Sequence, residues 1–273
     1  MISLLAMTSI ILTVVVSVEA TFETKPGVVP LGMGGAYVSQ AEGSNAIFWN
    51  PAGLGYLKKA EISMVYGKEY VGLDSDNLSN WYAGLVYPLG DYGAVGIGEL
   101  YFNSEVYKEN TGIISFGRKF GEISTGINFK VLSVMYSETG YTKTDPIFMA
   151  NGMSKTRISI DAGIIYKATD ELSIGANVED MNQPNMSLGN ESEGIVPMKI
   201  NAGSSYKIGR LTPAVGITYR NKSINEKKEI NIQAGVEFWS ASEDIGLRGG
   251  YNTYEFTAGA SFRFLSGGQI DYA

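Results

Sequence analysis

The chain of 273 residues contains no cysteine and no histidine. Without cysteine it can form neither a disulfide framework nor a reactive thiol. Without histidine it lacks the commonest general base and the commonest neutral metal ligand. Most hydrolase and metalloenzyme schemes are therefore excluded, and the sequence predicts a protein that is not an enzyme and that uses no cofactor and no metal.

Charge is sparse and scattered along the chain. The 28 acidic and 21 basic residues give a formal net charge of −7. A protein that follows a nucleic-acid backbone concentrates lysine and arginine in a patch or stripe. No such stripe is present in this sequence, so nucleic acid is not an expected partner.

Two groups of acidic residues could suggest chemistry but have simpler interpretations. Glu138 and Asp145 could form a carboxylate pair, yet nothing in the sequence positions them for acid–base work. The segment Asp74–Asn77 is rich in oxygen ligands but lacks the twelve-position spacing of a dedicated calcium loop. A solvated turn is the better interpretation of that segment.

Long apolar runs are missing except near the N-terminus. Residues 1–20, MISLLAMTSIILTVVVSVEA, end in a small-x-small triplet and predict a signal peptide cleaved before Thr21. A membrane anchor is the alternative, but the apolar run Ile10–Val16 is short. No lysine or arginine occurs before Lys25, which is unusual for a leader and allows a true start further upstream. Beyond this leader no segment approaches the roughly 20 apolar residues that a membrane helix needs.

What the chain has in abundance is alternation of apolar and polar residues. In Glu229–Trp239 and in Arg157–Lys167 every second residue is apolar, which indicates strands with one apolar and one polar face. The polar faces carry eight charged residues of both signs that we expect to face a lumen: Arg157, Asp161, Lys167, Glu179, Arg220, Glu237, Glu255 and Arg263. Mixed charge at this density predicts an interior that is wet or bridged by ion pairs.

The lengths of the strands and loops separate a membrane barrel from a soluble sandwich. About twelve complete strands are expected, at 60–70, 80–89, 93–103, 111–120, 123–135, 156–168, 172–179, 198–207, 211–221, 229–239, 245–251 and 254–264, with another beginning at Gln269. Many have roughly ten residues and end in an aromatic residue, as tilted membrane strands do, whereas sandwich strands average about five or six. Short connections alternate with longer ones, as do the periplasmic turns and external loops of outer-membrane barrels. A closed sheet is required because lipid cannot satisfy a free strand edge.

The segment Leu31–Leu57, LGMGGAYVSQAEGSNAIFWNPAGLGYL, precedes the first strand and is expected to fill the lumen as a hatch. Its glycines allow tight packing or positive φ, and its Asn-Pro pair is a good helix start. A dinucleotide loop is not indicated, because no βαβ unit surrounds the glycines. The expected hatch or gating residues are Gly32, Gly34, Gly35, Asn50, Pro51, Ala52, Gly53 and Leu54. The simplest role for Asn50–Leu54 is to turn the chain from the hatch into the barrel.

This segment resembles the N-terminal hatch of the FadL-type outer-membrane channels, and more closely that of the PorV/PorQ-like barrels. The resemblance continues through DAGIIYKATDELSIGANVEDMNQP, VPMKINAGSSYKI, INIQAGVEFWSASEDIGLRGGYN and FTAGASFRF. It implies an all-β fold: an antiparallel transmembrane β-barrel of fourteen strands, of which about twelve are complete here, with an N-terminal hatch plugging the lumen. The expected division is 1–20 signal peptide, 21–58 hatch and 59–273 barrel. We expect either truncation at the C-terminus or closure of the barrel at twelve strands.

The resemblance implies two alternative functions at the cell outer membrane of a Gram-negative-type bacterium. The first, as in FadL, is transport of small hydrophobic molecules across that membrane under control of the hatch, and it is preferred because it needs only the barrel and the hatch. As in PorV, the barrel could serve a type IX-like secretion system as a non-enzymatic shuttle or scaffold. The expected partners are outer-membrane lipid, the barrel-assembly machinery, and either a hydrophobic small molecule or secreted protein cargo.

Overall fold

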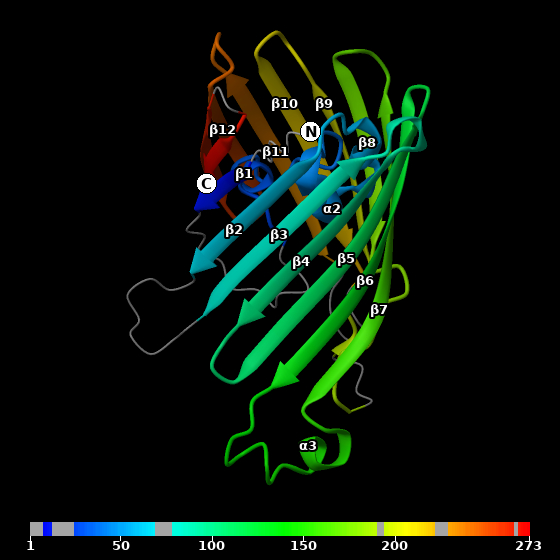
Figure 1. Cartoon of the computed structure of the whole chain (residues 1–273), viewed down its shortest axis with the longest axis vertical. Coiled ribbons are helices and arrows are strands. Elements are labelled where there is room, and N and C mark those ends of the chain that lie inside the picture. The colour runs from blue at the N-terminus through cyan, green and yellow to red at the C-terminus, as the bar shows by residue number, and fades with distance from the viewer. Residues whose placement is uncertain (1–7, 13–24, 69–77, 190–193, 222–228, 265–266) are drawn as a thin grey trace, which may run out of the picture.

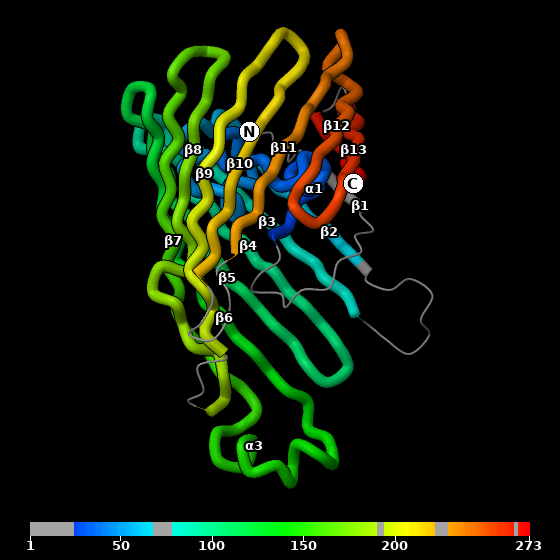
Figure 2. The backbone as a smooth tube through the Cα atoms, turned by 180° about the vertical axis from the view of Figure 1, so that it is seen from behind, coloured from blue at the N-terminus to red at the C-terminus, as the bar shows by residue number. Residues whose placement is uncertain are grey.

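The computed structural model of the chain describes residues 8–12, 25–68, 78–189, 194–221, 229–264 and 267–273. Its strands form one sheet in which they follow each other in chain order, as Figures 1 and 2 show from two sides. The strands are β1 (Thr8–Leu12), β2 (Glu61–Lys68), β3 (Ser79–Pro88), β4 (Ala94–Asn103), β5 (Tyr107–Phe120), β6 (Ile123–Tyr136), β7 (Ser154–Lys167), β8 (Leu172–Glu179), β9 (Lys199–Tyr206), β10 (Leu211–Arg220), β11 (Glu229–Trp239), β12 (Ile245–Asn252), β13 (Phe256–Arg263) and β14 (Gln269–Tyr272).

Strands β2 to β14 pair antiparallel with their neighbours, as the alternation of the sequence predicts. Each of the thirteen lies where the sequence analysis expects it. β5 begins at Tyr107, earlier than the expected residue 111, because 107–110 continue the ladder with β4 and β6. β1, which was not predicted, pairs in parallel with β2 and also contacts β14. It lies inside the segment expected to be a signal peptide, and that expectation stays a prediction.

The outer surface of the sheet is apolar and the inner surface is polar. Ile97, Ile158 and Ile232 point outward and are 61–62 % exposed, whereas Ser115, Ser159 and Asn177 point inward and are buried. A soluble sandwich would bury the aliphatic face. The exposed aliphatic band therefore fits a barrel whose outer surface contacts lipid. Exposed aromatic residues cluster near the short-turn end of the strands: Tyr87, Tyr92, Phe120, Tyr166, Tyr206, Phe238, Phe262 and Tyr272.

The longest connections lie at one end of the sheet, as expected, but two connections at that end are short: 104–106 between β4 and β5, where a longer loop 104–110 was expected, and 253–255 between β12 and β13. Strands β5, β6 and β7 are 14 residues each and extend beyond their neighbours at the long-loop end, where the loop 137–153 carries the short helix α3 (Pro146–Asn151) (Figure 1). The turn helix η4 (Gly90–Tyr92) lies at the opposite end. Among the described residues, no helix is long and apolar enough to cross a membrane.

The hatch occupies the space enclosed by the curved sheet, toward its short-turn end (Figures 1 and 2). It contains four short helices: α1 (Val28–Gly32), η2 (Gly43–Asn45), α2 (Ala46–Trp49) and η3 (Pro51–Tyr56). Its apolar side chains form the main core of the protein with inward-facing residues of the wall. That core includes Tyr37, Ile47, Leu54, Val86 and Ile165. The hatch, and not a second sheet, therefore supplies the dry interior.

Candidate functional site

The hatch backbone lies directly against glycines on the inner face of the wall. A Cβ atom on Gly126 would lie 2.2 Å from the carbonyl carbon of Pro51, and one on Gly175 would lie 2.5 Å from the carbonyl oxygen of Val38. On the far side, a Cβ on Gly250 would lie 2.2 Å from the backbone nitrogen of Gly34. No side chain fits at such distances, so these wall glycines are required for the hatch to sit where it does.

The predicted hatch glycines serve the same close approach from the other side. Gly34 and Gly35 have φ of 65° and 84°, the left-handed region that glycine adopts without strain. A Cβ on Gly34 would meet the backbone of Tyr251 at 2.6 Å, and one on Gly53 would meet the carbonyl oxygen of Ala41 at 2.0 Å. Gly32 packs against the Cα of Gly259. Close packing and positive φ, which the sequence analysis gave as alternatives, are both present at Gly34.

Asn50 connects the hatch to two strands and is fully buried. Its Oδ1 accepts a hydrogen bond from the backbone N–H of Ala52 at 3.1 Å, and Pro51 follows at the first helical position, as predicted for a helix start. Its Nδ2 lies within 2.9–3.3 Å of three carbonyl oxygens, those of Val38 in the hatch, Ile164 in β7 and Ala176 in β8. The corner therefore does more than turn the chain, because it also fixes the hatch to the wall.

Four wall side chains donate hydrogen bonds to hatch carbonyls, and one of them, Thr257 in β13, donates to the carbonyl of Gly32 at 3.3 Å. Asn128 in β6 donates to the carbonyl of Ile47 at 2.8 Å, and Asn177 in β8 donates to that of Trp49 at 2.7 Å. Ser124 in β6 donates to the carbonyl of Ala52 at 2.6 Å. Helix ends leave carbonyls without an internal partner, and the wall satisfies those of α2 and η3. Nothing in the alternation of the sequence predicts these contacts.

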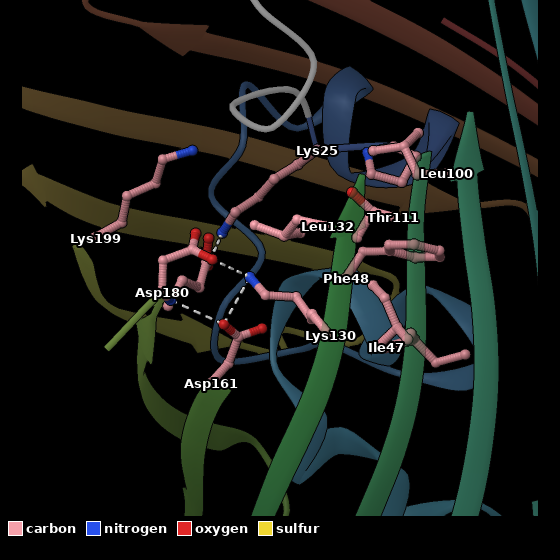
Figure 3. Close-up of a pocket in the computed structure, with 13 residues that line it drawn as sticks. Lys25, Ile47, Phe48, Leu100, Thr111, Lys130, Leu132, Asp161, Asp180 and Lys199 are labelled. Carbon is pink, nitrogen blue, oxygen red and sulfur yellow. Dashed lines mark hydrogen bonds and ion pairs between the residues drawn. The ribbon is translucent and has the colours of Figure 1, made fainter. Parts of the chain in front are cut away.

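A buried ion cluster lies where the hatch meets β6, β7 and the end of β8 (Figure 3). Lys130 lies 2.7 Å from a carboxylate oxygen of Asp161 and 2.6 Å from one of Asp180. The backbone N–H of Asp180 donates to Asp161 at 2.9 Å, and the hydroxyl of Ser159 donates to Asp180 at 2.7 Å. Asp180 has a φ of 52°, which is uncommon for a residue other than glycine. The cluster is saturated with partners, as buried charges require.

A second ion pair ties the start of the hatch to β8. Lys25 pairs with Glu179, and its ammonium lies 4.8 Å from the centre of the Trp49 ring. Asn177 and Asn201 also donate to Glu179, at 3.0 and 2.8 Å. Burial raises the pKa of the Tyr37 phenol well above its usual range, so this side chain stays neutral. The Tyr37 ring packs edge-on against Trp49, with 6.0 Å between the ring centres.

The third charged group lies beside α1, on strands β11 to β14. Arg248 pairs with Glu237 at 2.7 Å and lies 4.0 Å from Asp271. Its guanidinium and that of Arg263 both lie over the ring of Trp239, at 5.4 and 3.7 Å from its centre. The interior is thus bridged by ion pairs, one of the two states that the sequence predicted.

The eight charged residues expected in the lumen all lie on the inner face or at its rim, but they do not form one site. Asp161, Glu179 and Glu237 belong to the three ion clusters, Arg263 stacks on Trp239, and Arg220 pairs with Glu229 at 3.5 Å. Lys167 lies over the Tyr56 ring near the short-turn end. Arg157 and Glu255 are exposed. Their assignment as functional residues stays a prediction.

The cations at the centre of these clusters were not among the predicted site residues. Lys130 and Arg248 lie on the polar faces of two predicted strands. Alternation alone could have found both. Lys25 and Asp180 lie outside the strands, and no periodic signal marks them. Glu138 and Asp145 do not pair: Glu138 binds Lys143 at 3.1 Å, and Asp145 caps α3. The loop Asp74–Asn77 lies outside the described residues.

Two cavities lie on the long-loop side of the hatch. The smaller, about 50 Å³, is bounded by the Lys130 cluster on one side and by Ile47, Phe48 and Leu100 on the other (Figure 3). The larger, about 430 Å³, lies between the hatch and the inner faces of β9 to β13. Lys25 and Lys199 line both cavities and separate them.

At the long-loop end, residues 180–189 and 194–197, between β8 and β9, pack on the inner wall. Met186 and Val196 pack on Leu132 and Val134, which face inward from β6. Lys155 in β7 donates to the carbonyls of Ser187 and Gly189. The described parts of this loop therefore pack on the inner faces of β6 and β7 at the long-loop end.

Comparison with known proteins agrees with the barrel. The model of a family described as type IX secretion system membrane protein PorP/SprF matches residues 36–271. The fold is similar to the CymD monoaromatic hydrocarbon channel, with a TM-score of 0.61, 13 % identity, and coverage of 87 % of this chain and 88 % of that one. It is also similar to a Pseudomonas aeruginosa FadL homologue, with a TM-score of 0.61, 13 % identity, and coverage of 89 % and 88 %. The Pseudomonas putida toluene transporter TodX gives a TM-score of 0.58, 11 % identity, and coverage of 88 % and 89 %.

These comparisons confirm the FadL-like barrel fold and the link to type IX secretion. They correct the expected PorV/PorQ relationship, because the family model that matches is that of PorP/SprF. None of the curated proteins matches the chain. Both the family and the fold are associated with channels and secretion.

Proposed function

Because the chain belongs to the PorP/SprF family of type IX secretion system membrane proteins, we propose that this outer-membrane β-barrel is a non-enzymatic scaffold of a type IX-like secretion system. The observation that carries the proposal is the fixed hatch. Glycine contacts, the Asn50 bonds and the buried Lys25–Glu179 ion pair attach the hatch to the wall. A barrel plugged in this way offers its outer loops, and not its lumen, to other proteins.

The loop 137–153 is the part of the described surface that best fits a docking role. It stands on the extended strands β5 to β7, and Phe148 anchors it by packing on Tyr136 at 5.2 Å between ring centres. Tyr141, Ile147 and Met149 remain exposed on it. Exposed apolar residues on a supported loop are typical of protein contact sites. We expect secreted protein cargo or another component of the secretion system to bind there.

The remaining partners follow from the same architecture. Outer-membrane lipid would contact the exposed aliphatic band, and the barrel-assembly machinery would insert the chain. Both are expectations from the fold class.

The second candidate function is passage of small hydrophobic molecules. The fold resembles channels for monoaromatic hydrocarbons and a toluene transporter, which supports this alternative. The inner wall near the long-loop end also carries Phe102, Tyr107 and Tyr136 in a row of ring contacts. A hydrophobic molecule moving inward from this row would meet the Lys130 cluster and would have to displace the hatch. The polar lumen therefore favours the scaffold.

A reversible lock on the hatch separates the two candidates. A Cβ on Gly84 would lie 3.3 Å from the Cβ of Ser44, close to the separation of about 3.8 Å in disulfides. The chain has no native cysteine, so a Ser44→Cys/Gly84→Cys variant would form a single defined bond. The test is complementation of a strain that has a type IX system and lacks this gene, with cargo measured in the medium.

The scaffold predicts that the oxidised variant supports secretion as well as the wild type, and that an Ile147→Asp/Met149→Asp variant does not. Single-cysteine variants control for the substitutions themselves. If the oxidised lock abolishes uptake of a labelled aromatic hydrocarbon while secretion is unaffected by deletion of the gene, the transport function replaces the scaffold.

A further inference from the structure

The larger cavity, of about 430 Å³, is a pocket with a floor, a wall and an open side. Leu31, Gly34, Gly35 and Trp49 of the hatch form the floor. The wall consists of inward-facing residues at the long-loop ends of β9 to β13. The volume lies within the range of roughly 300–1,000 Å³ that small-ligand sites occupy. Because the pocket lies on the long-loop side of the hatch, a ligand bound in it would not have to pass the hatch.

The wall is built mainly of carboxamides and hydroxyls, which both donate and accept hydrogen bonds. They are Thr218, Asn201, Asn231, Gln233, Asn252 and Thr257. Several are held in place by each other. Thr218 donates to Asn201 at 2.6 Å, and Gln233 donates to Thr218 at 3.0 Å. The wall is therefore an ordered array of neutral polar groups.

The charges around the cavity compensate each other. Lys25 is neutralised by Glu179, and Arg220 lies 3.5 Å from Glu229. The remaining charged residues on the lining, Lys199 and Glu255, have opposite signs. A site of this kind gives no net attraction to a strongly charged ligand. It also has no continuous apolar wall for a hydrocarbon.

Aromatic rings complete the lining. Trp49 forms part of the floor, and Tyr254 lies at the rim with 61 % of its surface exposed. A molecule with many hydroxyls and an apolar ring face matches planar amides together with aromatic rings.

From these observations we propose that the cavity binds a short neutral saccharide on the external side of the hatch. This inference goes beyond the scaffold role and does not depend on it, because it rests on the lining of the cavity alone. Binding would involve Gln233, Thr218 and Asn231 on the wall, with the exposed ring of Tyr254 against the apolar ring face of the sugar and the buried Trp49 in the floor.

The test is a titration of the purified full chain in a detergent without a sugar headgroup, such as an amine oxide. The probes are glucose, N-acetylglucosamine and their disaccharides, with glucose 6-phosphate and arginine as charged comparisons. A Trp81→Phe/Trp239→Phe variant leaves Trp49 as the only tryptophan, so its fluorescence reports on the cavity floor. Saturable quenching or enhancement by a neutral saccharide, with weaker binding of the charged probes, is the expected result.

Two variants test the wall. Thr218→Val keeps the shape of the side chain and Gln233→Leu removes a carboxamide, and each is expected to weaken binding about tenfold. Asn151→Leu in the distant α3 is the matched control and should leave binding unchanged. Heat-modifiable gel mobility checks that every variant is folded.

Absence of saturable binding by every neutral saccharide, up to about 100 mM, overturns the proposal and leaves a water-filled lumen. Equal binding in wild type and in both wall variants also overturns it, because the ligand would then lie elsewhere. The secretion assay decides the scaffold separately, so failure of one proposal does not imply failure of the other.

Discussion

The two sides of the lumen are built differently although the same hatch lies between them. On the β4–β8 side the hatch is in direct contact with the wall through glycines and Asn50. Asn128 links the hatch to the Lys130 cluster, because its Nδ2 donates both to the carbonyl of Ile47 and to Asp161. On the β9–β13 side the hatch also touches the wall closely, through Gly32, Met33 and Gly34, but a polar cavity remains on the long-loop side of that contact. Both sides hold the hatch, but only the β9–β13 side leaves a cavity large enough for a ligand.

The largest difference in stability is expected when a glycine on each side of the lumen is replaced by alanine. Gly126→Ala places a methyl group 2.2 Å from the backbone of Pro51, which has no flexible side chain that could yield. Gly216→Ala meets only the end of the Gln233 side chain, at 2.8 Å, as its nearest neighbour. We expect Gly126→Ala to lose the compact unboiled form in gel mobility and Gly216→Ala to keep it. Equal behaviour of the two variants would show that the sides do not differ in packing.

Removal of Lys130, the central cation of the buried cluster, is expected to lower the stability of the barrel nearly as much. Lys130→Met leaves Asp161 and Asp180 buried without their counter-ion, which typically destabilises a protein by about 3–5 kcal/mol. The measurement is the temperature at which the heat-modifiable form is lost. A Lys130→Met/Asp161→Asn/Asp180→Asn variant should recover much of the loss. A Lys130→Met protein as stable as the wild type would show that the ion cluster does not stabilise the barrel.

Asn50 should contribute less to the free energy of unfolding than the ion cluster does, but more than an ordinary surface residue. Asn50→Ala removes bonds to hatch and wall carbonyls that have no access to water, at about 1–3 kcal/mol. Hydrogen–deuterium exchange of residues 36–57 should increase in this variant. Asn151→Ala in α3 is the control and should leave exchange of the hatch unaltered. An unchanged hatch in Asn50→Ala would mean that glycine packing alone holds it.

The smallest effect on stability is expected on the cavity side. Thr218→Val removes one hydroxyl from the cavity wall without changing its shape, and the loss should be about 1 kcal/mol or less. The same melting experiment measures it. A loss as large as that of Lys130→Met would show that the cavity wall stabilises the barrel as much as the ion cluster does, and the contrast between the sides would disappear.

The sequence predicts the strands well because the alternation is governed by one physical requirement. Residues such as Ile158 and Ile232 must face lipid while Ser159 and Gln233 face inward, so each strand records its own orientation. The hatch is also visible, because glycine and Asn-Pro signals precede the first strand. These signals act over a few residues, and that is why they can be read from one chain.

The contacts that hold the hatch could not be predicted in the same way. Asn50 meets Ile164 and Ala176, more than a hundred residues away, and Lys25 meets Glu179 across a similar separation. No local pattern encodes which wall residue opposes which hatch residue. One usable signal is glycine on the inner face of successive strands. Gly117 in β5 pairs with Gly126 in β6, which pairs with Gly163 in β7. A row of inward glycines indicates close approach of another backbone.

The most direct test of the fixed hatch is conductance in planar bilayers of the Ser44→Cys/Gly84→Cys protein, measured before and after reduction. If the native contacts already hold the hatch, both the oxidised and the reduced protein will be closed, with the same rare openings as the wild type. Steady conductance that appears on reduction and disappears on oxidation would contradict the account, because it would show a hatch that moves freely in the native barrel.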